Sequence, residues 1–216
     1  MRLADLLPLF PLDLVLFPET PLPLHIFEPR YREMIGECLC EKREFGVIRA
    51  LAQEGGEESA QVRHRLAECG CTAEIVDVLR TYPDGRTDIL VAGRRRFEVV
   101  AVDDSRLFFR GEVRFVEDVP SISKDRKLQK TALEQHYQLM LMTSTEAPSL
   151  DEKSEVLSFH LAYALPVDLD FKQALLEMRS EDERLRTLLE YYSKVIPKLK
   201  VMASKQKKAG SNGWVH

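Results

Sequence analysis

The four cysteines are the first residues whose type and spacing could support chemistry, because paired thiolates bind metal ions. They form two Cys-x-Cys pairs, Cys38/Cys40 and Cys69/Cys71. Structural zinc sites favour two to four intervening residues, so this spacing is already unsuitable. Cys38 also lies in a segment with helical periodicity, where residues two apart point about 200° apart. We therefore predict reduced thiols, with Cys38 facing the core, and no metal site.

A second group of metal-ligand types comprises His64, Glu68, Cys69 and Cys71. If this segment is a strand, His64 and Glu68 face away from the two cysteines, which argues against a shared ion. The sequence also has no nucleophile elbow and no G-x-x-x-x-G-K-[ST] motif to hold nucleotide phosphates. We therefore assign no catalytic residue and expect neither catalysis nor a cofactor.

A third group surrounds the Glu28-Pro29 pair. His25 has apolar neighbours on both sides, and such a histidine more often packs and hydrogen-bonds locally than acts as a general base. Arg30 and Tyr31 could bind a ligand. We favour a structural role, in which Tyr31 belongs to a helix core and Arg30 bridges the sheet and a carboxylate.

Three consecutive arginines, Arg94, Arg95 and Arg96, raise the question of nucleic-acid binding. On a strand, Arg94 and Arg96 share one face, and no base-stacking aromatic pattern accompanies them. The protein has a net charge of −4, so it also lacks the excess of positive charge that is typical of nucleic-acid binders. We favour solvated charges or ion pairs with the abundant acids, and RNA binding remains the alternative.

The first half of the sequence contains short apolar runs separated by turn-forming residues. Proline inside the early runs is typical of edge strands. Tyr82-Pro-Asp-Gly-Arg86 predicts a hairpin turn. Six or more short strands imply a closed or nearly closed antiparallel barrel. The predicted strands are residues 7–10, 14–17, 22–27, 45–51, 73–80, 87–92, 97–102 and 107–116.

One helix is predicted between these strands. Glu28-Pro29 begins it, because proline at the first helical position loses no hydrogen bond. Apolar residues then recur at steps of three and four, which predicts a buried stripe. Its members are Tyr31, Met34, Ile35, Cys38 and Leu39.

From Pro120 onward the apolar period changes to that of helices. Ser149-x-x-Glu152 and Ser180-x-x-Glu183 match the capping box of a helix start, and Asp170 with Gln173 is a weaker version. Pro197 should kink or end the last helix. We expect a β-barrel over residues 1–118, a helical bundle over residues 121–202 and a flexible tail over residues 203–216.

The amino-terminal apolar run does not resemble a signal peptide. Pro8, Pro11, Asp13 and Pro18 interrupt it, and no small-residue cleavage pattern follows. No apolar stretch approaches the roughly 20 residues that a membrane-spanning helix needs. We therefore expect a cytoplasmic protein that has no membrane partner.

Two long sequence blocks near the start of the chain resemble the opening motif of the amino-terminal domain of the Lon protease. The first is Pro8-Leu-Phe-Pro-Leu-Asp-Leu-Val-Leu-Phe-Pro18, and the second is Leu22-Pro-Leu-His-Ile-Phe-Glu-Pro-Arg-Tyr-Arg-Glu-Met-Ile35. The same domain type occurs in cereblon. Residues 70–75, 90–97, 157–166 and 172–177 resemble later parts of the domain, so the resemblance spans roughly residues 6 to 195. One departure is Glu19-Thr20, where the family usually has Gly.

The resemblance implies an α+β fold, with a pseudouridine-synthase-and-archaeosine-transglycosylase-like (PUA-like) antiparallel β-barrel, an inserted helix and a C-terminal helical bundle. In the full protease this domain helps capture unfolded or tagged polypeptides, while separate domains hydrolyse ATP and cut the chain. We therefore expect a free-standing, non-catalytic polypeptide-binding or adaptor protein. The alternatives are an RNA-binding PUA-like protein and a helper that associates with a protease or chaperone.

For polypeptide capture, the resemblance and the apolar runs together indicate a groove near the proline-rich first strands. Edge strands can bind an extended peptide through main-chain hydrogen bonds, and side-chain pockets add selectivity. The candidate residues are Leu14, Leu16, Phe17, Pro18, Leu22 and Phe27.

Overall fold

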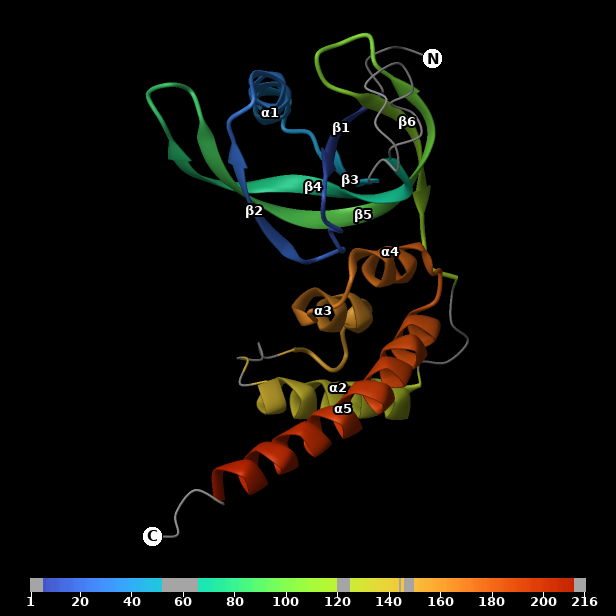
Figure 1. Ribbon diagram of the computed structural model, residues 1–216. Coiled ribbons are helices and arrows are strands. Elements are labelled where there is room, and N and C mark those ends of the chain that lie inside the picture. The colour runs from blue at the N-terminus through green and yellow to red at the C-terminus, as the bar shows by residue number, and fades with distance from the viewer. Residues whose placement is uncertain (1–5, 52–65, 120–124, 144, 146–149, 212–216) are drawn as a thin grey trace. The chain divides into compact units, whose positions relative to one another are not determined.

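The computed structural model describes residues 6–51, 66–119, 125–143, 145 and 150–211, and side chains up to 204 (Figure 1). The chain forms two compact units. One comprises Met1–Asp118 with Pro166–Arg179, and the other comprises Val119–Leu165 with Ser180–His216. Residues 166–179, which the sequence-based division assigned to the helical part, therefore group with the strands. His64 and Ser149 lie outside the described residues.

The first unit contains a six-stranded sheet in the order β2-β5-β4-β3-β1-β6. Because β5 also pairs with β6, the five strands β1, β3, β4, β5 and β6 form a closed cycle of pairings. Strand β2 lies outside this cycle and pairs with β5. β1 and β3 are parallel, so the sheet is mixed. The prediction of a purely antiparallel sheet was therefore wrong. A parallel pair needs a long crossover connection, which β2 and α1 supply here. The strands are β1 (Leu7–Leu12), β2 (Pro21–Ile26), β3 (Phe45–Ala50), β4 (Leu66–Thr81), β5 (Thr87–Asp103) and β6 (Arg110–Val116).

The predicted hairpin joins β4 to β5. The Tyr82 N–H donates to the Arg86 carbonyl at 2.8 Å, and Gly85 adopts a positive φ of 83° at the turn. Both strands are longer than predicted because the register continues through β-bulges at three places. The local turn signal was therefore sufficient to predict the hairpin, but not its length.

Residues 14–17, predicted as a strand, belong to the loop between β1 and β2. Phe17 is 1% exposed, and its carbonyl accepts a 2.8 Å hydrogen bond from the Thr20 hydroxyl. A Cβ at Gly93 would lie 2.0 Å from the Phe17 carbonyl oxygen, so glycine allows the loop to approach β5. Glu19 adopts φ 59°, a left-handed conformation that favours glycine. The loop is thus held against the sheet without being part of it.

Helix α1 (Pro29–Glu41) begins at the predicted proline. Four residues of the predicted stripe are buried, and the ring centroids of Tyr31 and Phe10 lie 4.2 Å apart. The prediction for Leu39 was wrong, because it is 40% exposed at the edge of the stripe beside the exposed Cys40. The helix therefore covers the core cluster of the first unit with a stripe that ends at Cys38.

Lys42 caps the C-terminal end of helix α1: it adopts a left-handed conformation with φ 51° and donates its N–H to the Cys38 carbonyl. Glycine at this position should raise the free energy of unfolding by about 0.5 to 1 kcal/mol, because it relieves the Cβ clash but adds freedom to the unfolded chain. Urea denaturation followed by circular dichroism measures the change. Lys42→Ala, which keeps the clash, is the control, and an equal gain from alanine would exclude this cause.

Helix α4 (Leu169–Glu177) belongs to the first unit. The Asp168 carboxylate caps it by accepting a hydrogen bond from the Phe171 N–H at 2.7 Å, so the weaker capping box predicted at Asp170 and Gln173 was wrong. Those two side chains instead contact the strand segments. Asp170 pairs with Arg49 at 2.7 Å, and the Gln173 amide donates to the Cys69 carbonyl at 3.0 Å.

The second unit contains the helices α2 (Arg126–Thr143), α3 (Leu157–Ala164) and α5 (Glu181–Ser211). The Ser180 hydroxyl accepts from the Glu183 N–H at 3.3 Å, as predicted for a capping residue. The capping box ending at Glu152 does not begin a helix, because that residue lies in a turn and α3 begins later. α5 continues past Pro197 and includes the first residues of the predicted tail.

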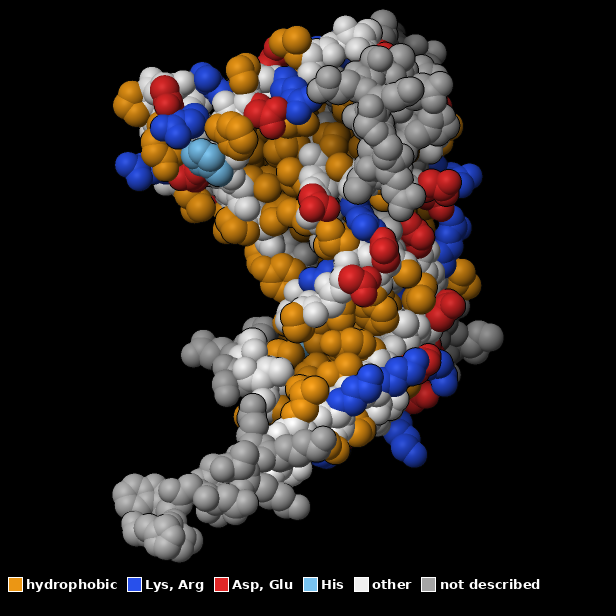
Figure 2. Space-filling model, in the orientation of Figure 1, with side chains coloured by type: hydrophobic (Ala, Val, Ile, Leu, Met, Phe, Trp, Pro, Cys, Tyr) orange, Lys and Arg blue, Asp and Glu red, His pale blue; other side chains and the backbone are white. Residues whose placement is uncertain are grey.

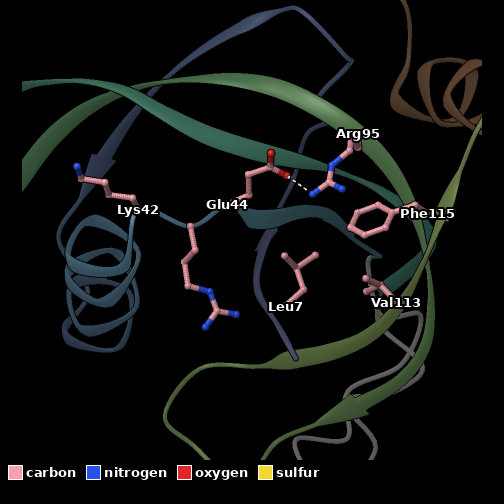
Figure 3. Close-up of a pocket in the computed structure, with 7 residues that line it drawn as sticks. Leu7, Lys42, Glu44, Arg95, Val113 and Phe115 are labelled. Atoms are coloured by element: carbon pink, nitrogen blue, oxygen red, sulfur yellow. Dashed lines mark hydrogen bonds and ion pairs between the residues drawn. The ribbon is translucent and has the colours of Figure 1, made fainter. Parts of the chain in front are cut away.

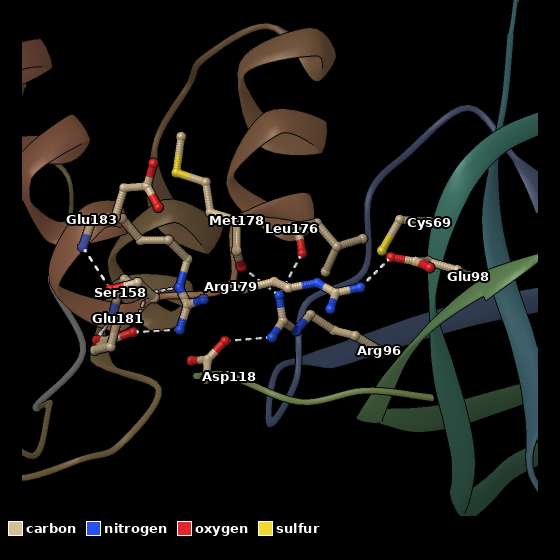
Figure 4. A network of polar contacts seen from close by, with 12 residues as sticks. Cys69, Arg96, Glu98, Asp118, Ser158, Leu176, Met178, Arg179, Glu181 and Glu183 are labelled. Carbon is tan, nitrogen blue, oxygen red and sulfur yellow. Dashed lines mark hydrogen bonds and ion pairs between the residues drawn. The ribbon is translucent and has the colours of Figure 1, made fainter. Parts of the chain in front are cut away.

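Buried polar groups stabilise the second unit (Figure 4). Arg184 is fully buried and donates to Ser158 and to Glu181, each at 2.8 Å, while its guanidinium lies 4.2 Å from the Phe159 ring centroid. This arrangement pairs the charge and satisfies its donors, as burial requires. Within the described residues, no helix is long and apolar enough to span a membrane.

Candidate functional site

A hollow in the first unit is lined mainly by hydrophobic side chains (Figure 2), in the region that lies between β1 and β2 in Figure 1. The first unit also contains partly buried side chains that pack against its core cluster. Such side chains are held in place by the core and still have surface to offer a ligand. They are Leu12, Leu14, Leu22, Leu24 and Ile75.

The side chains of strand β2 alternate in burial. Leu22 and Leu24 are partly buried, while Pro21, Pro23 and His25 are exposed, as a period of two predicts. β2 pairs with β5 along its whole length. Because proline has no N–H, Pro21 and Pro23 limit the main-chain donors that this edge strand can offer to an added strand. Side-chain contacts are therefore the main means of recognition available here.

The six candidate residues predicted from the sequence fall into three groups. Leu16, Phe17 and Pro18 are buried, with Phe17 1% exposed, so they form core and offer no surface to a ligand. Their apolar run was interpreted as a strand edge, whereas it folds as a buried loop. Leu14 and Leu22 are partly buried against the core cluster. Phe27 is 58% exposed at the end of β2.

Phe27 neighbours a polar cluster. The ring of His25 stacks with Phe27 at 5.9 Å, and its Nδ1 lies 2.5 Å from an Asp88 carboxylate oxygen. The Tyr82 hydroxyl donates to the other oxygen at 2.8 Å. Two hydrogen bonds lower the pKa of Asp88: the one with His25 contributes most, and the one from Tyr82 contributes next. His25 thus hydrogen-bonds to a residue of the neighbouring strand β5.

The Glu28-Pro29-Arg30-Tyr31 sequence serves to join helix and core. Tyr31 is 5% exposed, and burial raises the pKa of its hydroxyl. Arg30 donates to the Glu28 carboxylate at 2.9 Å, and its guanidinium lies 4.5 Å from the Tyr31 ring centroid. The predicted bridge from Arg30 to the sheet is therefore replaced by a pair with a carboxylate two residues away.

The three consecutive arginines form ion pairs. Arg94 pairs with Glu74 at 2.6 Å, and Arg95 pairs with Glu44 at 3.0 Å. Arg96 differs because its side chain is 4% exposed. It pairs with Asp118 and donates to the Leu176 carbonyl at 2.8 Å and the Met178 carbonyl at 2.5 Å (Figure 4). Arg96 thus binds the C-terminal end of α4, a structural role that the sequence did not reveal.

A second surface cavity of about 390 Å³ lies in the first unit (Figure 3). The Arg95 guanidinium lies 4.0 Å from the Phe115 ring centroid beside it. No sequence motif indicated this cavity, because four separate segments contribute to it. Its lining residues are Leu7, Lys42, Arg43, Glu44, Arg95, Val113 and Phe115.

The cysteines differ in accessibility. Cys38, Cys69 and Cys71 are buried and Cys40 is exposed. Burial raises the pKa of Cys38 to about 11 and that of Cys69 to about 12. In the part of the chain that the structure describes, no group of three or more His, Cys, Asp or Glu side chains could hold a metal ion.

Alkylation should therefore distinguish the thiols. At pH 8, iodoacetamide should label Cys40 rapidly and the three buried cysteines slowly, because the thiolate is the reactive form and burial suppresses both ionisation and access. Peptide mass spectrometry locates the label, and a sample in denaturant should react at all four positions. Rapid native labelling of Cys69 would contradict the burial described above.

A family model described as the ATP-dependent protease La (LON) substrate-binding domain matches residues 6–194. The chain belongs to the Lon substrate-binding domain family. The match corresponds to the substrate-binding domain of these proteases and not to their protease domain. This assignment confirms the family resemblance of the two early sequence blocks.

Curated relatives of this Lon domain are full-length proteases. Lon protease 1 of Hydrogenovibrio crunogenus is 25% identical over 184 residues, which cover 82% of this chain and 22% of that protein. The Lon protease of Parabacteroides distasonis is 31% identical over 129 residues, or 59% of this chain and 15% of that protein. The chain therefore spans less than a quarter of the length of these two relatives.

Solved Lon domains share the fold. The crystal structure of a Lon N-terminal domain protein from Xanthomonas campestris has a TM-score of 0.62 and 28% identity, covering 87% of this chain and 98% of that chain. The N-terminal domain of the Mycobacterium avium complex Lon protease has a TM-score of 0.58 and 20% identity, covering 88% and 98%. The second likeness concerns the fold alone.

Proposed function

We propose that the chain is a non-catalytic polypeptide-binding or adaptor protein that holds apolar side chains of unfolded or tagged polypeptides in the hollow near β1 and β2. The observation that carries this proposal is the set of partly buried leucines over the core cluster, in a member of a substrate-binding domain family. A protease or a chaperone is the proposed recipient of the bound polypeptide.

We also propose that the first unit is a PUA-like β-barrel and that the helices of the second unit form a bundle. The cycle of pairings from β1 through β3, β4, β5 and β6 back to β1 supports the barrel. The burial of Leu139, Leu188 and Tyr192 supports a bundle core. In this arrangement the barrel wall provides a rigid support for the leucines of the hollow.

Affinity in such a site comes from burial of apolar area. A partly preformed hollow contacts few residues at a time, so we expect micromolar or weaker dissociation constants for an unfolded polypeptide. Apolar burial also depends little on salt, whereas phosphate contacts weaken steeply as salt rises. Salt dependence therefore separates polypeptide binding from RNA binding.

Phe27→Ser should weaken binding of a permanently unfolded, fluorescent polypeptide by roughly threefold to tenfold, because a large exposed apolar side chain is lost from the end of β2. Fluorescence anisotropy at low and moderate salt measures the affinity. Leu107→Ser is the matched control, since Leu107 is 68% exposed in the loop before β6.

Leu14→Ser should weaken binding of the polypeptide more than Phe27→Ser does. Circular dichroism verifies that each variant is folded. Equal effects of Phe27→Ser and Leu107→Ser would mean that binding follows general surface hydrophobicity. Tight, salt-sensitive binding of single-stranded RNA with no polypeptide signal would favour the RNA-binding alternative and contradict the proposal.

A further inference from the structure

The cavity beside Arg95 combines charge with an apolar surface. Leu7, Val113 and Phe115 supply apolar side chains from β1 and β6. Figure 3 shows the Arg95 guanidinium group beside the Phe115 ring, with Glu44 next to it. Phe115 is 45% exposed, so its ring retains surface for a ligand. The cavity thus offers an apolar contact and a charged contact within about 390 Å³, the space of one or two residues.

Positive charge exceeds negative charge among the lining residues. Lys42, Arg43 and Arg95 face a single acid, Glu44. Figure 3 shows the Lys42 ammonium group directed away from Arg95, so the nearby cationic groups are the guanidinium groups of Arg43 and Arg95, which pair with Glu41 and Glu44. Arg43 is held in place because it donates to the Leu6 carbonyl at 2.7 Å and to Glu41 at 3.1 Å.

Arg95 is also held in position. It donates to Glu44 at 3.0 Å from one side, and its guanidinium plane lies over the Phe115 ring at 4.0 Å. A guanidinium group has five N–H donors, and a single hydrogen bond to Glu44 leaves others for an additional acceptor. Its side chain is 58% exposed, which allows a ligand to reach it.

We infer that this cavity binds the free C-terminal carboxylate of a polypeptide whose last residue is apolar. This inference rests on the proposed polypeptide binding and names the feature of the bound chain that is recognised. A C-terminal apolar residue carries a carboxylate and an apolar side chain on the same Cα, which matches the juxtaposition of guanidinium groups and apolar side chains. An internal Asp or Glu has no apolar side chain of its own.

Two fluorescent peptides of identical sequence, both ending in leucine, test the inference. One has a free C-terminal carboxylate, and the other has a C-terminal amide. The protein should bind the free acid about tenfold more tightly, as expected for a charge-assisted pair. Arg95→Gln should reduce this preference to less than about twofold. Arg94→Gln is the matched control, because Arg94 is a neighbouring exposed arginine paired with Glu74 and is absent from the cavity lining.

A third peptide separates end recognition from general charge. It has an internal aspartate and a C-terminal amide, so its net charge equals that of the free acid, and it should bind like the amide. Equal binding of the free acid and the amide overturns the inference, and so does an Arg94→Gln effect as large as that of Arg95→Gln. Circular dichroism verifies that both variants fold.

The test also separates this inference from the proposed function. If the unfolded polypeptide binds but neither leucine-ending peptide does, end recognition is wrong and polypeptide binding stands. If the unfolded polypeptide and all peptides fail to bind, both proposals are overturned. A free-acid preference that Arg95→Gln abolishes supports both.

Discussion

Arg96→Met should lower the free energy of unfolding of the first unit by about 3 to 5 kcal/mol, the range typical for removing one partner of a buried, hydrogen-bonded ion pair. Methionine preserves much of the side-chain length but removes every donor. The carbonyls of Leu176 and Met178 and the carboxylate of Asp118 then lose their guanidinium partner. Urea denaturation followed by circular dichroism measures the loss.

Arg94→Met is the control for this experiment. Arg94 is 43% exposed and pairs with Glu74 in solvent, where ion pairs contribute less than about 1 kcal/mol. Amide hydrogen exchange adds a local readout, because the amides of α4 should exchange faster in Arg96→Met than in the wild type. A stability loss no larger than that of Arg94→Met would show that Arg96 does not hold α4.

Acidification from pH 7 to pH 5 should destabilise the second unit through His136. This residue is fully buried in α2 and hydrogen-bonds to the Tyr192 hydroxyl at 3.0 Å. Burial lowers its pKa from 6.5 to about 4. Between these values the unfolded chain binds a proton that the folded chain does not, so stability falls as pH decreases. The full effect is roughly 3 kcal/mol, of which roughly 2 kcal/mol is lost by pH 5.

His136→Gln isolates this contribution because it removes the titrating group. The informative quantity is the slope of the unfolding free energy against pH, which does not depend on a constant difference in stability between the variant and the wild type. The slope between pH 7 and 5 should be smaller in His136→Gln than in the wild type. Equal slopes would show that His136 is not the group whose protonation is coupled to unfolding.

Local signals predicted the parts of the fold that depend on neighbouring residues. Pro29 begins α1, Ser180 caps α5 and the Tyr82–Arg86 turn joins β4 to β5, because a cap, a turn or a proline acts within about four residues. Leu14 and Leu22, which the resemblance and the apolar runs indicated, are partly buried against the core cluster.

Contacts between distant segments were not predictable in this way. The parallel pairing of β1 with β3 depends on the crossover that contains α1. The grouping of α4 with the sheet depends on Arg96, whose sequence position among three arginines gives no sign of burial. The apolar run that contains Phe17 has the composition of a strand, but the space left by Gly93 allows this segment to fold inward as a loop.

The pairing of β1 with β6 also constrains the order of events during synthesis. Leu7 pairs with Gly111, so the ribosome releases β1 long before its partner on that side exists. The carbonyls that accept from Arg96 arrive later still, at Leu176 and Met178. The β4–β5 hairpin can form early because its contacts are local, whereas the strand cycle must close late. Until β6 is synthesised, a nascent chain therefore lacks the strand that pairs with β1 on this side, and the apolar residues of β1 lack that neighbour.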